Sequence, residues 1–301
     1  MKRIVTLSVI LLIITGLPLF AAGIRDERLS ESKTSVWLIT SENNTMFLGG
    51  SIHILRESDF PLPRNFDYAF SQSDILILEA DTKQMESPEI IQYLMDSMFL
   101  PVGTGLQSIL NKEVYELLSA ACMEYGIVID DIGNLKPAMI MNILTLFQME
   151  KYGFVQEGVD DYYYNKADYE NKPIDFLESV QSQIDMILTM GDGYENEYVL
   201  YSLQDMEYTG ALLNILLAQW KIGASSITEL TLTEMKEHWP EIYKSLITDR
   251  HDLWLPQIEH YLTSDKVYFV IVGLAHIHGP DGLLKYLEDL GYEIEQLTTG
   301  Y

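Results

Sequence analysis

The stretch MFLGGSIH, residues 46–53, joins a short apolar run to a histidine through two glycines. The apolar run is too short for a helix and stops at Gly49 and Gly50, which predicts a buried strand that ends in a tight turn. His53 follows directly after that end. The stretch therefore predicts a strand that delivers an imidazole to one edge of a sheet.

The stretch ILILEAD, residues 75–81, repeats this pattern with an acid in place of the histidine. Its apolar part is rich in β-branched residues and predicts the next buried strand, which closes on Glu79. A carboxylate at the end of an apolar strand is costly unless it is paired, hydrogen-bonded or bound to a metal. Taken alone, Glu79 also fits a solvated cap, so the ends of the other strands decide between the two interpretations.

Apolar runs alternate with amphipathic segments along the rest of the chain. This alternation predicts an α/β (α+β) fold with a central mixed, largely parallel sheet flanked by helices. A helical insertion lies between the predicted strand at residues 75–78 and the predicted strand at residues 172–179, the second and third strands of the parallel series. Strands are expected over residues 36–40, 45–48, 75–78, 172–179, 267–273 and 294–297, and the principal helices over 66–70, 88–99, 112–125, 137–152, 180–187, 197–220, 233–239, 240–247, 250–262 and 280–291.

The length of the chain allows one large globular domain or two modest ones. The 301 residues are 48% hydrophobic, which is ample for a sizeable core, and we expect a single domain over residues 36–301. The 19 basic and 45 acidic residues give a formal charge of −26, which argues against binding to nucleic acid. The negative charge also favours the attraction of cations, although we attribute most of this charge to the need for solubility.

The N-terminus has the layout of a secretory signal. Lys2 and Arg3 precede an apolar run over residues 4–20, and small residues follow it. Residues 1–22 are therefore a signal peptide or, if uncleaved, an N-terminal membrane anchor, and residues 23–35 a flexible lead. We expect an exported protein, periplasmic or secreted, whose membrane contact is limited to residues 4–22.

Cys122 is the only cysteine, so the fold has no internal disulfide. It lies among small and apolar residues of a predicted helix. We therefore interpret it as a buried structural thiol rather than a nucleophile.

Four apolar runs end, in chain order, on His53, Glu79, Glu178 and His276. Because ligands gather at the carboxyl ends of strands in an α/β sheet, we expect these groups to converge. Two imidazoles and one or two carboxylates are enough to hold a divalent ion with a position left for water. The two histidines also share a spacing, GSIH and GLAH, in which a glycine three residues earlier lets the chain turn sharply after the strand.

In these motifs the chain resembles the TraB/GumN family, which includes the Tiki proteases. The resemblance spans residues 37–297 and departs from the family pattern at His251, where the family usually has Asn. It is carried by the GxxH of residues 50–53, Glu79, Leu177 with Glu178 and Gln183, Arg250, and the GxxH of residues 273–276 with Gly279.

The resemblance implies an erythromycin-esterase-like α/β fold and a metal-dependent, peptidase-like activity. We therefore interpret the chain as a metal-dependent hydrolase that acts on a peptide or protein substrate. His53 and His276 are metal ligands and Glu79 is a ligand or the general base. Glu178 is a further ligand or supports one, and Arg250 stabilises developing charge. The ion is Zn, Mn or Co.

A second interpretation is a non-catalytic protein of the cell envelope that captures a peptide, a metal or haem. The 19 tyrosines and 13 methionines suit such a pocket, although most belong to the core. His238, His260 and His278 are interpreted as surface or core residues. The role of His251 is left open, because Arg250 beside it holds a substrate carboxylate or balances the acids of the site.

Overall fold

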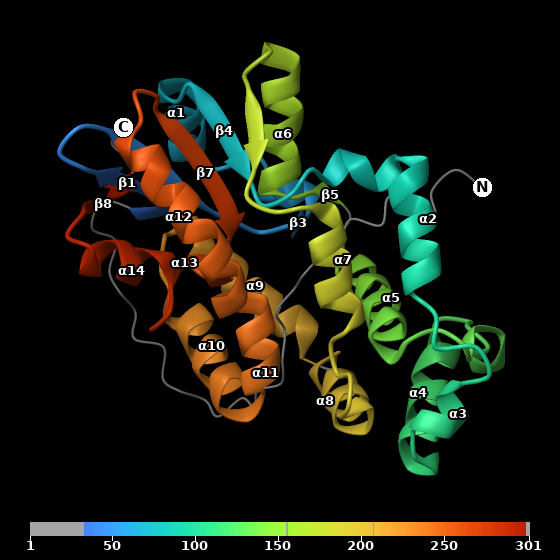
Figure 1. Ribbon diagram of the computed structural model, residues 1–301. Coiled ribbons are helices and arrows are strands. Elements are labelled where there is room, and N and C mark those ends of the chain that lie inside the picture. The colour runs from blue at the N-terminus through green and yellow to red at the C-terminus, as the bar shows by residue number, and fades with distance from the viewer. Residues whose placement is uncertain (1–32, 155, 207, 299–301) are drawn as a thin grey trace. The chain divides into compact units, whose positions relative to one another are not determined.

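The computed structural model describes residues 33–154, 156–206 and 208–298 (Figure 1). The predicted export segment and residues 23–32 of the predicted lead lie outside the described residues. Two compact units are present, and each is built from separate stretches of the chain. The sheet unit comprises the described residues of 33–80, 156–178 and 212–298, and the helical unit comprises 81–154 and 179–211. The prediction of a single domain over residues 36–301 stays a prediction.

A six-stranded sheet in the order β6-β4-β7-β2-β1-β8 forms the centre of the sheet unit. All six predicted strands are present, and the α/β fold class is confirmed. β1 begins three residues before the predicted start, because Thr34 and Ser35 are buried with their hydroxyl groups bonded to backbone carbonyls. The strands are β1 (Lys33–Thr40), β2 (Thr45–Ser51), β4 (Ile75–Leu78), β6 (Ile174–Phe176), β7 (Tyr268–Gly273) and β8 (Glu293–Thr298).

The pairing is mixed and largely parallel, as predicted. β2, β4 and β6 run parallel to their neighbours in the series β2-β7-β4-β6, whereas β1 is antiparallel to both β2 and β8. Ser51 at the end of β2 lies beside Gly273 at the end of β7. Leu78 at the end of β4 likewise lies beside Phe176 at the end of β6. The carboxyl ends of four strands therefore share one edge of the sheet.

One face of this sheet is covered by helices α12 (Asp249–Thr263) and α14 (Leu283–Asp289). Trp254, Ile258 and Leu262 of α12 are fully buried against residues of β1, β2 and β7. Their spacing of four residues places them on one side of the helix. Figure 1 shows α12 along β7.

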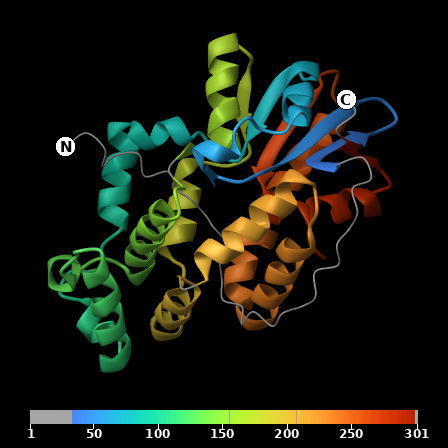
Figure 2. The ribbon, with the colours of Figure 1, turned by 180° about the vertical axis from the view of Figure 1, so that it is seen from behind.

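The opposite face carries an aromatic core. Successive side chains of β7 alternate between faces, so Phe269 points away from α12 and lies against Phe66 of α1 (Arg64–Gln72) and Tyr163 of α6 (Val159–Glu170). Trp220, fully buried near the end of α9 (Thr209–Lys221), joins Phe66 at a ring distance of 5.8 Å. Seen from behind in Figure 2, α1 lies on this side of the sheet. Helices on both faces complete a three-layer unit.

The predicted helical insertion between β4 and β6 is present as residues 81–154 of the helical unit, which also includes residues 179–211 after β6. This unit contains α2 (Pro88–Ser97), α3 (Leu106–Ile109), α4 (Lys112–Glu124), α5 (Pro137–Lys151), α7 (Val180–Leu188), α8 (Glu195–Met206), and 3-10 turns at Thr82–Glu86 and Ile129–Ile132. The single helix predicted over residues 197–220 is wrong, because α8 and α9 are separate helices. Tyr208 lies outside both helices, in a turn where its backbone N–H donates to the carbonyl of Asp205 at 2.9 Å.

The helical layer predicted before residue 248 is present as α10 (Ser226–His238), α11 (Pro240–Tyr243) and a π-helical turn at Lys244–Thr248. The sheet unit also contains α13 (Leu274–Ile277) and a 3-10 turn at Glu57–Asp59, which were not predicted. No helix among the described residues is both long and apolar enough to cross a membrane.

A two-stranded ribbon that the sequence did not reveal joins the end of β2 to the start of α6. It pairs β3 (Ile54–Leu55) with β5 (Gln156–Glu157), and Val159 N donates to the carbonyl of Ile52 at 3.0 Å. A methyl group added at Gly158 would lie 2.4 Å from the backbone carbon and oxygen of His53. The chain at residue 158 therefore passes too close to His53 for any side chain.

We expect Gly158→Ala to destabilise the protein by about 1–3 kcal/mol, because the clash is with backbone and cannot be relieved by a side-chain rotation. Gly133→Ala is the matched control, since its added methyl group would meet its nearest atom at 3.4 Å and its φ is −66°. Urea unfolding of both variants measures the difference. Equal stabilities of the two variants would contradict the close approach at residue 158.

Candidate functional site

The shared edge of the sheet brings together the residues that the sequence singled out. His53 follows β2, Glu79 follows β4 and Glu178 lies two residues beyond β6. His276 lies on α13, the short helix that begins directly after Gly273 at the end of β7. All four predicted ligands therefore lie in the sheet unit, at the carboxyl ends of its parallel strands.

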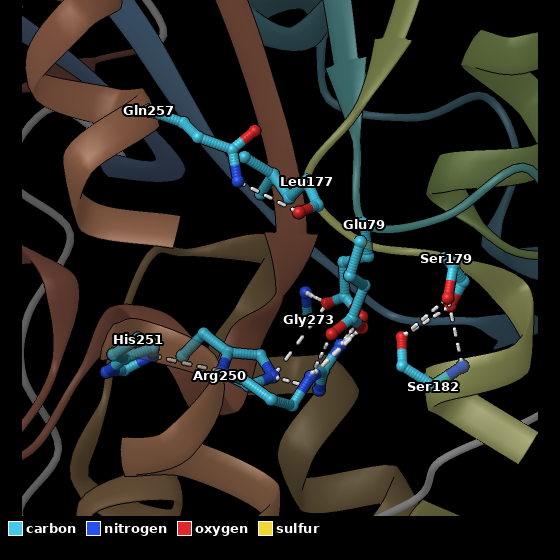
Figure 3. Close-up of polar contacts among 10 residues, drawn as sticks. Glu79, Leu177, Ser179, Ser182, Arg250, His251, Gln257 and Gly273 are labelled. Atoms are coloured by element: carbon cyan, nitrogen blue, oxygen red, sulfur yellow. Dashed lines mark hydrogen bonds and ion pairs between the residues drawn. The ribbon is translucent and has the colours of Figure 1, made fainter. Parts of the chain in front are cut away.

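Arg250 lies at the centre of the site with only 4% of its surface exposed. Nη2 donates to Oε2 of Glu79 at 2.5 Å and to Oε1 of Glu178 at 2.5 Å, as Figure 3 shows for Glu79. Nε also donates to Glu178, at 3.1 Å from Oε1 and 3.3 Å from Oε2. Nη1 lies 2.7 Å from Nε2 of His276. One guanidinium thus connects three of the groups at the strand ends.

The position of Arg250 depends on how α12 begins. The π-helical turn at Lys244–Thr248 lies immediately before the helix, and such turns rotate the side chains that follow relative to a regular α-helix. Cζ of Arg250 lies 4.4 Å from the centre of the Trp254 ring, one turn further along α12. The same ring lies 4.6 Å from the ring of His276. Trp254 therefore supports both polar groups from the core.

Glu79 is ionised in this environment. Burial raises the pKa of its carboxyl group, but the charges of Arg250 and His53 outweigh that effect and hold the pKa below its usual range. Its other oxygen, Oε1, accepts a hydrogen bond of 2.6 Å from the backbone N–H of Gly273 (Figure 3). Both oxygens of Glu79 are therefore held in place, one by a side chain and one by the end of β7.

Two buried histidines extend the network beyond Arg250. Nδ1 of His276 lies 3.0 Å from Nε2 of His251, and Nδ1 of His251 lies 2.8 Å from the carbonyl oxygen of Asp281. Burial lowers the pKa of both imidazoles, and the charge of Arg250 lowers both further, so that His251 reaches about 4 and His276 lies well below its usual range. Both rings are therefore neutral at physiological pH.

His53 has a partner that the sequence analysis missed. Its Nδ1 lies 3.1 Å from Oδ1 of Asp160, the second residue of α6, and the same oxygen accepts from Ser51 Oγ at 2.6 Å. Burial lowers the pKa of His53, but the charge of Asp160 and the hydrogen bond to it raise the pKa to about 9. The one available signal was the Gly158-Val159-Asp160 sequence, which by itself resembles an ordinary helix start.

The groups at the strand ends surround one point above Gly273. A methyl group added there would lie 3.0 Å from Nε2 of His53, 3.3 Å from Oε1 of Glu79 and 3.6 Å from Cδ2 of His276. The absence of a side chain at residue 273 leaves this point open. Two imidazoles and a carboxylate, delivered by three different strands, therefore face a common centre.

These donors fit a divalent ion in kind and in convergence, since imidazole nitrogen and carboxylate oxygen are its ordinary protein ligands. Their present spacing does not form a finished site. No group of three or more His, Cys, Asp or Glu within the described residues is spaced to hold a metal. Nε2 of His276 is instead occupied by Arg250, so an ion bound there requires the guanidinium to leave that atom.

The remaining predicted residues have simpler surroundings. Glu178 contacts Arg250 through both oxygens, and its role as a further ligand stays a prediction. His238 and His260 are exposed, and His278 lies edge-on to Trp37 at a ring distance of 5.2 Å. Cys122 is fully buried, and burial raises the pKa of its thiol to about 11, as expected of a structural cysteine.

The chain is thus an α/β protein whose parallel strands lead to two imidazoles and two carboxylates, with Arg250 of α12 buried among them. The sequence profile of the TraB/PrgY/gumN family matches residues 35–296. The chain belongs to that family, which confirms the resemblance seen in its motifs. No solved structure shows a significant match to this chain.

Relatives of the chain include one bacterial protein and two animal proteins. The uncharacterized protein YbaP of Escherichia coli strain K12 is 26% identical over 252 residues, which cover 83% of this chain and 90% of YbaP. The metalloprotease TIKI1 of Homo sapiens is 22% identical over 333 residues, which cover 90% of this chain and 63% of TIKI1. The metalloprotease TIKI1 of Xenopus tropicalis is 32% identical over 95 residues, 31% of this chain and 18% of that protein.

The His53–Asp160 pair predicts a specific pH dependence of stability in metal-free protein. Folding raises the pKa of His53 from 6.5 to about 9. The folded state therefore binds more protons than the unfolded state between these values. The stabilisation by the pair is complete below pH 6.5 and is lost as the pH rises through about 9.

We expect Asp160→Asn to flatten this decline, because the charge that raises the pKa is removed. Asp67→Asn is the control, since Asp67 pairs with Lys166 rather than with a histidine. Urea unfolding at a series of pH values, with chelator present, measures the free energy of unfolding. A decline of equal slope in the wild type and Asp160→Asn would contradict the pairing.

Proposed function

We propose that the chain is an exported metal-dependent hydrolase that acts on peptides or proteins. The observation that carries the proposal is the convergence of His53, Glu79 and His276 on the point above Gly273. The similarity to proteins named metalloprotease TIKI1 supports hydrolysis as the reaction and a peptide bond as its target. Export rests on the signal-like pattern of residues 1–22.

The residues that would hold the ion are His53 and His276, each through Nε2, and Glu79 through Oε1. A bound divalent ion such as Zn, Mn or Co polarises a carbonyl group and lowers the pKa of a bound water. The local charge favours a cation, because the three carboxylates of Glu79, Glu178 and Asp160 outnumber the positive charges of Arg250 and His53. Proton release accompanies binding, since His53 must be neutral to act as a ligand.

Glu79 and Arg250 supply the chemistry of the chain itself. Glu79 remains ionised, so Oε1 is able to accept a proton from water or to serve as a ligand. Once Nη1 of Arg250 leaves His276, it is a donor for an oxyanion that develops on the substrate carbonyl. Glu178 keeps the guanidinium in the site meanwhile, because it binds both Nε and Nη2.

We expect mature protein supplied with Zn, Mn or Co to cleave members of a peptide library, and the double variant His53→Ala, His276→Ala to lose that activity. The exposed His238→Ala and His260→Ala variants are the matched controls and should retain it. Mass spectrometry of the products separates cleavage from capture. Tight binding of an unchanged peptide would favour the capture protein, and cleavage that survives in the double variant would refute the assigned ligands.

Metal removal should also lower the melting temperature, because an ion that binds only the folded state stabilises it by mass action. The effect is about 2.7 kcal/mol when the ion is at a hundredfold excess over its dissociation constant. His53→Ala or His276→Ala should shrink the difference between melts with chelator and with added ion, and His238→Ala should leave it intact. A wild-type melt indifferent to chelator and to all three ions would refute the metal site.

A further inference from the structure

A linear series of polar groups leads from the centre of the site to the backbone. Nη1 of Arg250 lies 2.7 Å from Nε2 of His276, whose Nδ1 lies 3.0 Å from Nε2 of His251. Nδ1 of His251 lies 2.8 Å from the carbonyl oxygen of Asp281. His251 and His276 are exposed by only 4% and 2% of their surfaces, so the series runs through the interior. Hydrogen-bonding capacity then determines where each proton lies.

The Arg250 end of the series fixes the first proton. A guanidinium has only N–H donors, so Nε2 of His276 must accept from Nη1 and carries no proton. The one proton of a neutral His276 ring is therefore on Nδ1. That nitrogen faces Nε2 of His251 and donates to it.

The opposite end leads to the same assignment independently. A backbone carbonyl oxygen only accepts hydrogen bonds, so Nδ1 of His251 must carry the proton that is donated to Asp281. Nε2 of a neutral His251 ring is then unprotonated and must accept from His276. Both ends require the same direction for every bond in the series.

We propose that His251 is a positioning residue that is anchored on the carbonyl of Asp281, holds the proton of His276 on Nδ1, and thereby turns the Nε2 lone pair of His276 toward the site. The use of that lone pair by a metal ion rests on the proposed function. The hydrogen-bond direction itself does not. Partners that fix the ring orientation and tautomer of a metal-binding histidine are a common requirement of such sites.

The series holds a proton rather than transferring it. Its last acceptor is a peptide carbonyl, which does not take up a proton at physiological pH, so a proton added at His276 has no outlet through His251. His276 is therefore suited to donate its lone pair and unsuited to act as a proton shuttle. His53 differs, since its Nδ1 faces the charged carboxylate of Asp160.

Nitrogen-15 NMR of histidine-labelled, metal-free protein tests the proposal directly. We expect one proton on Nδ1 of His276, one on Nδ1 of His251, and a scalar coupling across the N–H···N bond between the two rings. A proton on Nε2 of His276, or no coupling between the rings, would overturn the inference. This measurement needs no activity and no bound ion.

Two substitutions separate positioning from general packing. His251→Gln places an amide oxygen within reach of His276 Nδ1, whereas His251→Ala removes the acceptor. By calorimetric titration with Zn, Mn and Co, we expect His251→Ala to bind about 10–100-fold more weakly and His251→Gln to recover most of the loss. His260→Ala, an exposed histidine of the same helix, should match the wild type.

The outcomes distinguish this inference from the proposed function. If the coupling is present and the wild type binds none of the three ions, the proposed function fails and the tautomer assignment stands. If the wild type binds an ion and His251→Ala binds it equally well, the metal site stands and the positioning role fails. If His251→Ala does not fold, the wild-type coupling and the His251→Gln titration decide.

Discussion

The buried contact of Arg250 with two carboxylates is the interaction on which the site depends. Glu79 follows β4 and Glu178 lies two residues beyond β6, so without the guanidinium two acids would face each other in the interior. Removing one partner of a buried ion pair typically costs about 3–5 kcal/mol, since the remaining charge is left uncompensated. The contact therefore joins α12 to the carboxyl ends of two strands while it sets the charge of the site.

That arrangement also explains why the donors converge without forming a finished metal site. The guanidinium already supplies a positive charge to Glu79 and occupies Nε2 of His276. An ion bound as proposed would compete with Arg250 for the same groups. Under the proposed function, Arg250 balances the acids before an ion binds and faces the substrate afterwards.

The two histidines near the strand ends are held by different kinds of partner. Asp160 holds His53 through a charge, which raises the pKa of His53 to about 9, whereas His251 holds His276 through a neutral ring. In both cases Nδ1 faces the partner, and Nε2 of His53 lies near the point above Gly273. The sheet brings the two rings together, and the surrounding helices determine how each ring is oriented.

The sequence by itself determined the six strands, the mixed and largely parallel sheet, and the four groups at its edge. Apolar runs that stop at glycine or at an acid have a clear local signature, and parallel pairing places their ends together. Only the tertiary structure decided that Arg250 joins Glu79 and Glu178, that Asp160 pairs with His53, and that His251 contacts His276. These contacts join residues that are 25 to 171 positions apart in the sequence. In addition, Asp160 belongs to the start of α6, which looks ordinary in the sequence. Polar contacts of this kind follow no periodicity, because they depend on where folded elements meet rather than on local spacing.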